Sequence, residues 1–469
     1  MKNKEVELKV LISRQDLRKL LNANFMKEAI VENSKAKHNL ISSYYDTEDL
    51  YFKKNGIAYR VRDKGDGTFE ATVKTGKKNQ GGVTERIEIN IPLEKDEAVL
   101  EGFGPLGLGY ELTELAPDGV TRLFTVDVER TTYDLEFEGS TFELAIDKGK
   151  ITSELTKNKD KIDEIEIEIK EGSVKKLLKL AALIAKTVPI FIESRSKFAR
   201  GLVLIGEDAT YPVVKRKMEA APIRTELLES FTARGNAALA AQSIVMNNNL
   251  SDDAIKELAK QTESMLSHML MASELDSKGL FEEYIDMVRE ILHVIYRVLD
   301  LRNMLALWRT VDTQGKAFSK TTMSITLQDN ISKAEEVLLE HLNLGKLTAI
   351  FYGVQAALTA SEWDNEEYME ATSVTRAVLK KWQDALDIEN RPEDAIVLAD
   401  NIMYLARNID AKYAEKLANN LKKKRSSLAA KALAKRLEQE LIRMLQLTNS
   451  KYIYRDAGVL LGMLIAKKK

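Results

Sequence analysis

The chain has 469 residues, of which 44% are hydrophobic and 30% are charged, so it is long enough for several globular domains and too apolar for a disordered protein. It contains no cysteine, which excludes disulfides, thiolate zinc sites and a cysteine nucleophile. The first residues lead into acidic positions and not into an apolar run, and no long uncharged apolar stretch follows, so we expect neither a signal peptide nor a membrane span and predict a cytoplasmic protein. The net charge of −2 conceals an asymmetry, because residues 411–469 hold 15 Lys and Arg against 4 Asp and Glu. This excess favours an anionic partner for the last segment.

The first 205 residues are typical of short strands joined by turns. In Lys4–Leu11, charged and apolar residues alternate, so Glu5, Glu7 and Lys9 share one face of a strand. Similar patterns predict further strands at Ala58–Arg62, Phe69–Thr75, Val83–Ile91, Thr141–Asp147 and Asp163–Ile169. Hairpin loops at Lys64–Gly67 and Lys77–Gly82 favour an antiparallel sheet or barrel. We expect two helices here, one capped by Ser13 and one at Val174–Lys186.

Several of these predicted strands carry a charged face. Arg60 and Arg62 alternate on one strand, and Glu164, Glu166 and Glu168 alternate on another. Taken alone, each of these strands is explained by a sheet with one face exposed to solvent. A closed antiparallel barrel explains the set, because it can gather the faces into one lumen with basic residues for an anion and carboxylates for a metal ion.

The pattern changes to helices beyond residue 222. Residues 206–222 lack periodicity and indicate a linker, so the predicted domains are 1–205 and 223–469. Apolar residues at helical spacing predict an all-α domain of one bundle, or two in tandem. Its predicted helices are Arg224–Met246, Asp253–Ala272, Leu280–Leu307, Ile331–Leu342, Asp364–Asp387, Pro392–Leu417, Ser426–Leu447 and Tyr452–Ala466.

The charged motifs of the first domain resemble, in their order, those of the CYTH or triphosphate tunnel metalloenzyme family. Glu5-Val6-Glu7-Leu8-Lys9 is similar to the Glu-x-Glu-x-Lys signature that opens the family, and Arg60-Val61-Arg62 to its Arg-x-Arg strand. The remaining positions are represented by Lys74, Arg86, Arg130, Asp147, Glu166 with Glu168, and Lys197 with Arg200. The resemblance implies an α+β chain with an N-terminal antiparallel eight-stranded β-barrel, the triphosphate tunnel, followed by the all-α helical-bundle domain.

The same resemblance implies roles for individual residues. Substrate phosphates would be bound by Lys9, Arg60, Arg62, Lys74, Arg86, Arg130, Lys197 and Arg200. One or two Mg²⁺ or Mn²⁺ ions would be held by Glu5, Glu7, Asp147, Glu166 and Glu168. Catalysis would involve Glu5, Glu7, Lys9, Glu166 and Glu168, with no single general base assigned. For Glu85, Glu143 and Glu164, metal binding and salt bridges that hold the basic residues in place are both open.

The helical domain resembles a CHAD domain in its position, its helicity and its basic residues. A basic helix motif is recognisable in His293–Arg302. The run Lys422–Arg425 either binds polyphosphate or forms a solvated helix end. Its basic neighbours are Lys412, Lys416, Lys431, Lys435 and Arg436. We consider nucleic acid a poorer partner, because no reading motif with interleaved aromatics is present, and His268, His293 and His341 lack the spacing of a metal site.

These observations predict a Mg²⁺- or Mn²⁺-dependent inorganic triphosphatase that produces diphosphate and phosphate, with a helical domain that binds polyphosphate. The same tunnel could instead act on an organic triphosphate, such as thiamine triphosphate, a nucleotide or an RNA 5′ end. A different class of function is a non-catalytic polyphosphate-binding scaffold. Acidic residues beside a bound phosphate argue against the scaffold, because a pure anion binder gains nothing from them.

Overall fold

The computed structural model describes residues 4–80, 82–104, 111–193, 195–207, 222–247, 249–311, 321–360, 370–384 and 411–468. The chain divides into two compact units, residues 1–214 and 215–469. Most of the predicted linker 206–222 and most of the predicted helix Pro392–Leu417 lie outside the described residues. None of the described helices combines the length and the apolar character that a membrane span requires.

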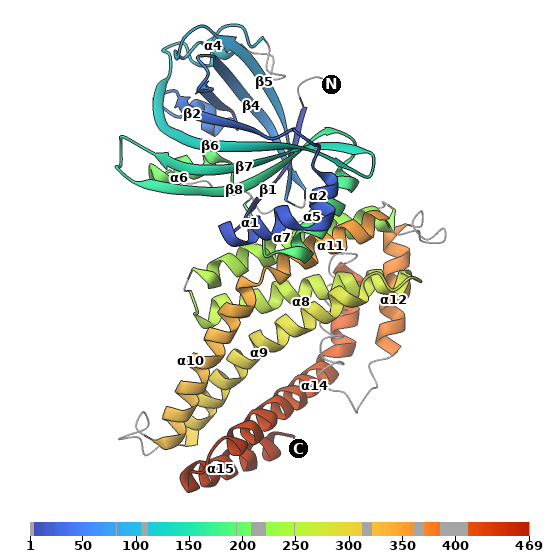
Figure 1. The fold of residues 1–469 in the computed structure, drawn as a ribbon. Helices are drawn as coiled ribbons and strands as arrows, with labels where there is room; N and C mark the ends of the chain where they lie inside the picture. The colour runs from blue at the N-terminus through green and yellow to red at the C-terminus, as the bar shows by residue number, and fades with distance from the viewer. Residues whose placement is uncertain are drawn as a thin grey trace. The chain divides into compact units, whose positions relative to one another are not determined.

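The first unit is a closed antiparallel barrel (Figure 1). Its eight strands follow the spatial order β5-β4-β3-β2-β6-β7-β8-β1, and β1 also pairs with β5, which closes the sheet. The strands are β1 (Lys4–Leu11), β2 (Ala36–Asp46), β3 (Ala58–Asp63), β4 (Phe69–Gln80), β5 (Val83–Leu93), β6 (Thr121–Phe137), β7 (Ser140–Thr152) and β8 (Lys159–Glu171). A short strand, β9 (Phe191–Ile192), pairs with the end of β1. The predicted fold, an eight-stranded barrel followed by helices, is confirmed.

Two details of the barrel differ from the sequence prediction. The strands β2 and β6 were not predicted, although the pairing between them is among the longest in the sheet. The strand β4 continues through Lys77 to Gln80, where Lys78 lies opposite Glu85, so the predicted loop Lys77–Gly82 is wrong for most of its length. A register shift between Thr75 and Lys78 marks the point at which the strand was expected to end.

Short helices flank the strands. The predicted helix after Ser13 is α1 (Arg14–Asn22), in which the Asp16 backbone N–H donates to the Ser13 hydroxyl at 3.1 Å. The second predicted helix is α5 (Val174–Thr187), which buries an apolar face and contacts β8. The remaining helices of the unit are α2 (Asn24–Ala29), α3 (Tyr51–Lys54), α4 (Leu112–Leu115) and α6 (Lys197–Leu204).

The helix α6 fills part of the barrel interior with apolar side chains. Phe198 and Leu202 join a buried cluster that includes Tyr44 and Phe124. Tyr44 and Phe124 come from β2 and β6, and Phe124 lies on the same face of β6 as Arg130, six residues away. Gly201 permits the close approach, since a Cβ atom there would lie 2.2 Å from the Phe124 ring. The polar part of the lumen therefore ends at α6.

The second unit is helical in all its described elements. Its helices are α7 (Ile223–Met246), α8 (Asp252–Leu275), α9 (Glu282–Val311), α10 (Thr322–Asn343), α11 (Lys346–Ala360), α12 (Ala371–Asp384), α14 (Ala411–Gln446) and α15 (Lys451–Lys468). The helix α11 was not predicted, and α14 is one continuous helix that includes Lys422–Arg425. The interpretation of this basic run as a helix end is therefore wrong.

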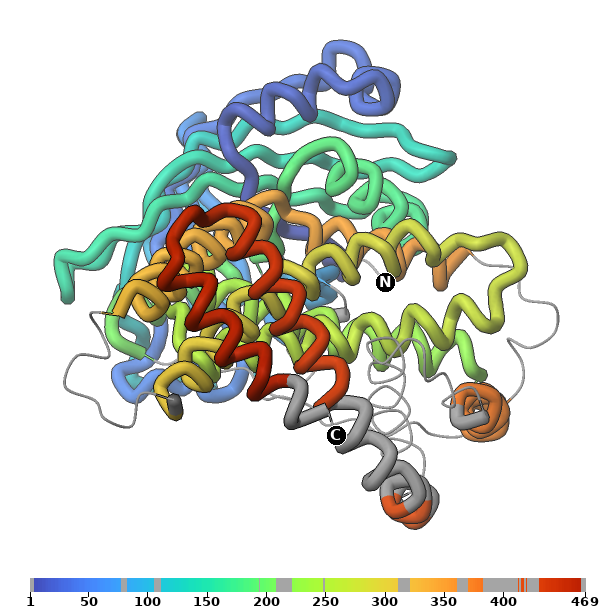
Figure 2. The backbone as a smooth tube through the Cα atoms, turned by 90° about the horizontal axis from the view of Figure 1, so that it is seen from below, coloured from blue at the N-terminus to red at the C-terminus, as the bar shows by residue number. Residues whose placement is uncertain are grey.

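Close packing and ion pairs join these helices. Phe351 of α11 covers Gly235 of α7, where a Cβ atom would lie 2.1 Å from the ring. Arg436 of α14 donates to Asp300 of α9 at 2.7 Å and lies over the Tyr296 ring, 5.0 Å from its centroid. The helices α14 and α15 form a hairpin, shown in red in Figure 2.

Candidate functional site

The barrel encloses a polar cavity of about 280 Å³. Eight cationic side chains line it: Lys9, Arg60, Arg62, Lys74, Arg86, Arg130, Lys170 and Lys197. Six carboxylates line it as well: Glu5, Glu7, Glu70, Glu88, Glu166 and Glu168. The other lining residues include Tyr44, Asn90 and Phe198. A cavity of this composition suits a small, highly charged anion and not an apolar ligand.

The structure brings together nearly all of the predicted site residues. Asp147 lines a small adjoining cavity of about 10 Å³, which it shares with Arg62, Arg130 and Lys197. Arg200 lines neither cavity, because its guanidinium donates to Asp160 at 2.8 Å and to Glu164 at 3.0 Å. Lys197 and Arg200 come from the helix α6 and not from a strand of the barrel.

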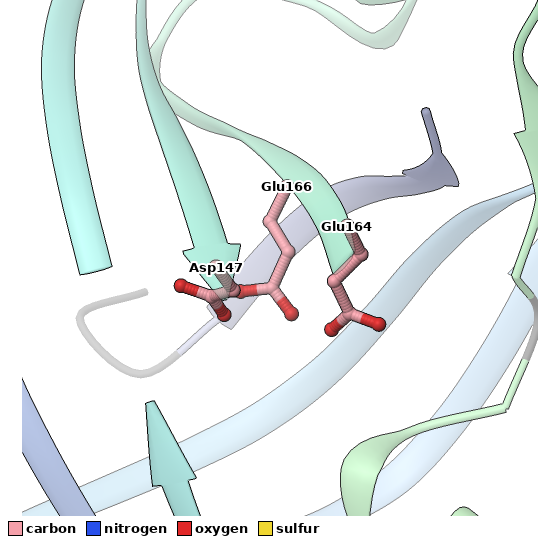
Figure 3. Close-up of side chains that lie close together, drawn as sticks. All are labelled: Asp147, Glu164 and Glu166. Carbon is pink, nitrogen blue, oxygen red and sulfur yellow. The ribbon is translucent and has the colours of Figure 1, made fainter. Parts of the chain in front are cut away.

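Three carboxylates lie close together beside the cavity, as Figure 3 shows. Asp147 on β7 stands opposite Glu164 on β8, and Glu166 is the next residue on the same face of β8. One carboxylate oxygen from each lies within 4.8 Å of the others, which is close enough for a shared cation. Within the described ranges, no other group of three potential ligands meets this spacing.

The chain's own cations already surround this trio. The Lys197 ammonium lies 2.7 Å from Asp147, 2.5 Å from Glu164 and 2.8 Å from Glu166. Arg130 donates two hydrogen bonds to Asp147 and one to Glu166, all between 2.6 and 2.7 Å. Although burial disfavours the ionised form, these cations and Lys9 hold the pKa of Glu166 well below its usual range. Lys197 and Arg130 lower the pKa of Asp147 in the same way, so Asp147 and Glu166 are both ionised and their charges are neutralised by these cations.

A second charged group lies around Glu5. The Lys74 ammonium donates to Glu5 at 2.8 Å and lies 2.9 Å from Glu88, and Arg60 lies 3.6 Å from Glu88. Burial, together with the charges of Glu7 and Glu88, raises the pKa of Glu5 to about 7 against the opposing effect of Lys74. Although burial opposes the shift, Lys74 and Arg60 lower the pKa of the neighbouring Glu88 to about 2, so within this pair the positive charge stabilises the ionised form of Glu88 more than that of Glu5.

Glu7 and Glu168 adjoin this second group. They are direct partners across the β1–β8 pairing. The Arg86 guanidinium lies 3.8 Å from Glu7, and the Lys170 ammonium lies 3.0 Å from Glu168. Burial, with the neighbouring carboxylates of Glu143 and Glu88, raises the pKa of Glu168 although Lys170 opposes the shift. Glu7 and Glu168 therefore each have one basic side chain within 4 Å among the described residues.

Three arginines that line the cavity, Arg60, Arg62 and Arg86, are incompletely paired among the described residues. Arg62 donates through Nε to the Ser42 hydroxyl at 2.9 Å, and no carboxylate in the described part of the chain lies within 4 Å of its guanidinium. Burial, with the charges of Arg60 and Arg130, lowers the pKa of Arg62 to about 9. The Nε atoms of Arg60 and Arg86 are buried without a hydrogen-bond partner. All three side chains line the cavity, where an anion could accept hydrogen bonds from their guanidinium groups.

Sequence reasoning missed some lining residues. Lys170 and Glu88 continue the alternations of β8 and β5 by one further position, a signal that could have identified them. Tyr44 lies on β2, whose residues alternate too weakly to predict its inward face. The sequence analysis left three carboxylates open between metal binding and salt bridges. All three are ion-paired: Glu85 with Lys4, Glu143 with Lys170, and Glu164 with Lys197 and Arg200.

In the helical unit, the basic motif of α9 is engaged within the protein. Arg302 donates to Glu335 at 2.6 Å, and Arg297 lies 3.6 Å from Glu440. His268 is buried, with Nε2 2.7 Å from the Ser230 hydroxyl and Nδ1 2.7 Å from the Ser264 carbonyl oxygen. Among the described residues, no histidine belongs to a group with metal-ligand spacing.

Comparisons with known proteins identify relatives of this chain. The model of the CYTH domain family matches residues 3–202. An inorganic triphosphatase from Haemophilus influenzae is 30% identical over 254 residues, which are 53% of this chain and 68% of that protein. Among solved structures, HpAC1 from Hippeastrum, described as having a dominant triphosphatase activity, is 20% identical and covers 44% of this chain and 97% of its own, with a TM-score of 0.30. PptA from Streptomyces chartreusis is 12% identical and covers 53% and 95%, with a TM-score of 0.37. These two structural similarities are too low to add to the argument.

Proposed function

The chain belongs to the family of CYTH-domain inorganic triphosphatases, and from this premise we propose that it hydrolyses inorganic triphosphate to diphosphate and phosphate in the barrel cavity. The observation that carries the proposal is the group of guanidinium donors of Arg60, Arg62 and Arg86, which line the cavity and are incompletely paired within the described residues. A polyphosphate anion supplies the negative charge and the acceptors that these donors lack.

The arginines would bind the phosphate chain. A guanidinium can donate two parallel hydrogen bonds to a phosphate, which fixes the anion in position as well as neutralising it. Phosphoryl transfer depends mainly on such positioning and charge neutralisation. Lys74 and Arg130 line the same cavity and would add positive charge as the leaving diphosphate develops.

A divalent cation such as Mg²⁺ or Mn²⁺ fits the carboxylates of Glu5, Glu7 and Glu168. They offer hard oxygen ligands, and because burial raises the pKa values of Glu5 and Glu168, a bound cation would stabilise their ionised forms. Their oxygens are not all within 4.8 Å of one another, so side-chain rotation would be needed to gather them. Asp147 and Glu166, predicted as metal ligands, are the less suitable pair because Lys197 and Arg130 already neutralise them. A cation bound at this position would supply charge neutralisation for the phosphates and acidify a water molecule.

In the reaction, a water oxygen attacks the terminal phosphorus and the bond from that phosphorus to the bridging oxygen breaks. The water proton passes to a carboxylate of the group Glu5, Glu7 and Glu168, and the bridging oxygen leaves as part of diphosphate. Lys9 and Lys197 would hold the neighbouring carboxylates Glu164 and Glu166 in place. The role of Lys197 is then to hold carboxylates and not to bind substrate.

The test is phosphate release from inorganic triphosphate, ATP, thiamine triphosphate and long-chain polyphosphate, each with Mg²⁺, with Mn²⁺ and with EDTA. We expect fast release from inorganic triphosphate that EDTA abolishes. Faster release from ATP or thiamine triphosphate would make an organic triphosphate the substrate. No release from any of the four would leave the non-catalytic scaffold as the better explanation.

For the helical unit we propose polyphosphate binding on α14. The proposal is supported by the resemblance to a CHAD domain and by the exposed Lys412, Lys416 and Lys431. Arg436 would not take part, because Asp300 and Tyr296 engage it. Reversing the four charges of Lys422–Arg425 should abolish binding of long-chain polyphosphate and leave triphosphate hydrolysis unchanged. Unchanged polyphosphate binding would show that this run is only a solvated surface.

A further inference from the structure

Lys170 differs from the other cations of the cavity in its exposure. Its side chain is 43% exposed, whereas those of Lys9 and Lys197 are 9% and 8% exposed. It lies near the end of β8, two residues beyond Glu168 and on the same face, and it lines the cavity. Lys170 is thus a long, mobile cation at the accessible edge of the charged lumen.

The ammonium of Lys170 has two carboxylate partners. It lies 3.0 Å from Glu168 and 3.8 Å from Glu143, which stand opposite each other on β8 and β7. Within the described ranges, Lys170 is the only cation within 4 Å of either carboxylate. The positive charge that neutralises Glu168 therefore comes from the Lys170 side chain, which can rotate away from it.

The divalent cation and the triphosphate proposed for this site would both act on the ion pair between Lys170 and Glu168. A divalent cation that uses Glu168 must displace the ammonium, because both compete for the same oxygens. A triphosphate in the cavity offers the displaced ammonium new acceptors, and a lysine is well suited to follow them because three rotatable donors end a flexible stem.

We propose that Lys170 is a switching substrate ligand, paired with Glu168 in the free protein and bound to a phosphate oxygen once a divalent cation has taken Glu168. This inference rests on the proposed function of the cavity. It assigns a binding role to a residue outside the motifs that the sequence analysis used. It also couples the two ligands, since cation binding releases a phosphate-binding group.

The test compares full-length Lys170→Met with Lys176→Met. The control removes a lysine of similar character, because Lys176 of α5 pairs with Glu138 at 2.5 Å and is 33% exposed, away from the cavity. Mn²⁺ binding to the protein without substrate is measured from the EPR signal of free Mn²⁺. The KM for inorganic triphosphate is measured at saturating Mn²⁺.

We expect the loss of the Lys170 charge to strengthen the binding of Mn²⁺ and to weaken that of triphosphate. Lys170→Met should bind Mn²⁺ about threefold more tightly, because a competing cation is gone, and should raise the KM for triphosphate about tenfold, because a charged contact is lost. Lys170→Arg should bring the KM for triphosphate most of the way back to the wild-type value. Lys176→Met should match the wild type in both measurements.

Other results would overturn the proposal. Weaker Mn²⁺ binding in Lys170→Met would mean that Lys170 only holds Glu168 in position, and an unchanged KM would mean that it never reaches the substrate. A wild-type protein that fails to hydrolyse triphosphate would refute the proposed function itself, and the Mn²⁺ measurement would still decide whether Lys170 competes for Glu168.

Discussion

Removing the charge of Arg62 should stabilise the free protein and impair catalysis at the same time. At pH 7 the guanidinium is charged in the folded and in the unfolded chain, so its depressed pKa lowers folding stability throughout the neutral range. The fall of the Arg62 pKa from its ordinary value to about 9 corresponds to at most about 5 kcal/mol. Because the side chain is partly exposed and lines the cavity, solvent screening reduces this to about 2 kcal/mol.

Arg62→Met also loses the hydrogen bond to Ser42, which costs about 1 kcal/mol. We therefore expect a net gain of about 1 kcal/mol, or about 2–4 °C in the Tm of the ligand-free protein by differential scanning calorimetry. In the phosphate-release assay, kcat/KM for triphosphate should fall about 100-fold, as expected for the loss of a charged contact worth about 3 kcal/mol.

The control is Arg122→Met, because Arg122 of β6 pairs at 2.9 Å with the exposed Glu154 and does not line the cavity. It should change neither the Tm nor the activity appreciably. A lower Tm in Arg62→Met would mean that its charge is compensated in the fold. An unchanged kcat/KM would refute the reasoning that Arg62 faces the substrate.

Three further predictions concern other parts of the molecule. Glu7→Gln and Glu168→Gln should each lower kcat for triphosphate about 10²–10⁴-fold with an unchanged circular dichroism spectrum, and wild-type rates in both would remove these residues from the reaction. Gly201→Val should destabilise the protein to urea by about 2–3 kcal/mol, because the new side chain would overlap the Phe124 ring; a neutral effect would show that α6 is not packed as described. Burial lowers the pKa of His268 from 6.5 to about 4, so the unfolded chain takes up this proton first. The contribution of His268 to folding stability should therefore be constant above about pH 6.5 and fall by up to about 3 kcal/mol between pH 6.5 and 4. In His268→Asn, urea unfolding across this pH range should show a smaller loss, and an identical loss would place the acid sensitivity elsewhere.

The sequence predicted the barrel best where one face of a strand is charged and the other apolar. Glu5, Glu7 and Lys9 alternate with Val6, Leu8 and Val10, and the structure places the first set in the cavity and buries Leu8 and Val10. The strand β2 escaped prediction because its residues do not alternate: buried positions cluster near its end and exposed positions near its start.

In the helical unit, prediction failed for a related reason. The helix α11 is buried on nearly all sides, so its sequence is mostly apolar and lacks the 3.6-residue period of a half-exposed helix. The helix α14 was divided at Lys422–Arg425 because a cluster of charges resembles a helix end, although Ala, Leu and Lys are good helix formers and sustain it.

The pairing of charges inside the barrel could not be predicted from spacing. The sequence placed Lys197 among the phosphate ligands, and the structure places its ammonium between three carboxylates. Which partner a cation takes depends on how β7, β8 and α6 meet in space. Residues from distant parts of the chain make that contact.

The most direct test of the central claim is the position of a bound inert triphosphate. A crystal structure of the full-length protein with imidotriphosphate and Mn²⁺ should show the phosphates in the barrel cavity against Arg60, Arg62 and Arg86. Phosphates bound only outside the barrel, in a protein that hydrolyses triphosphate, would contradict the account.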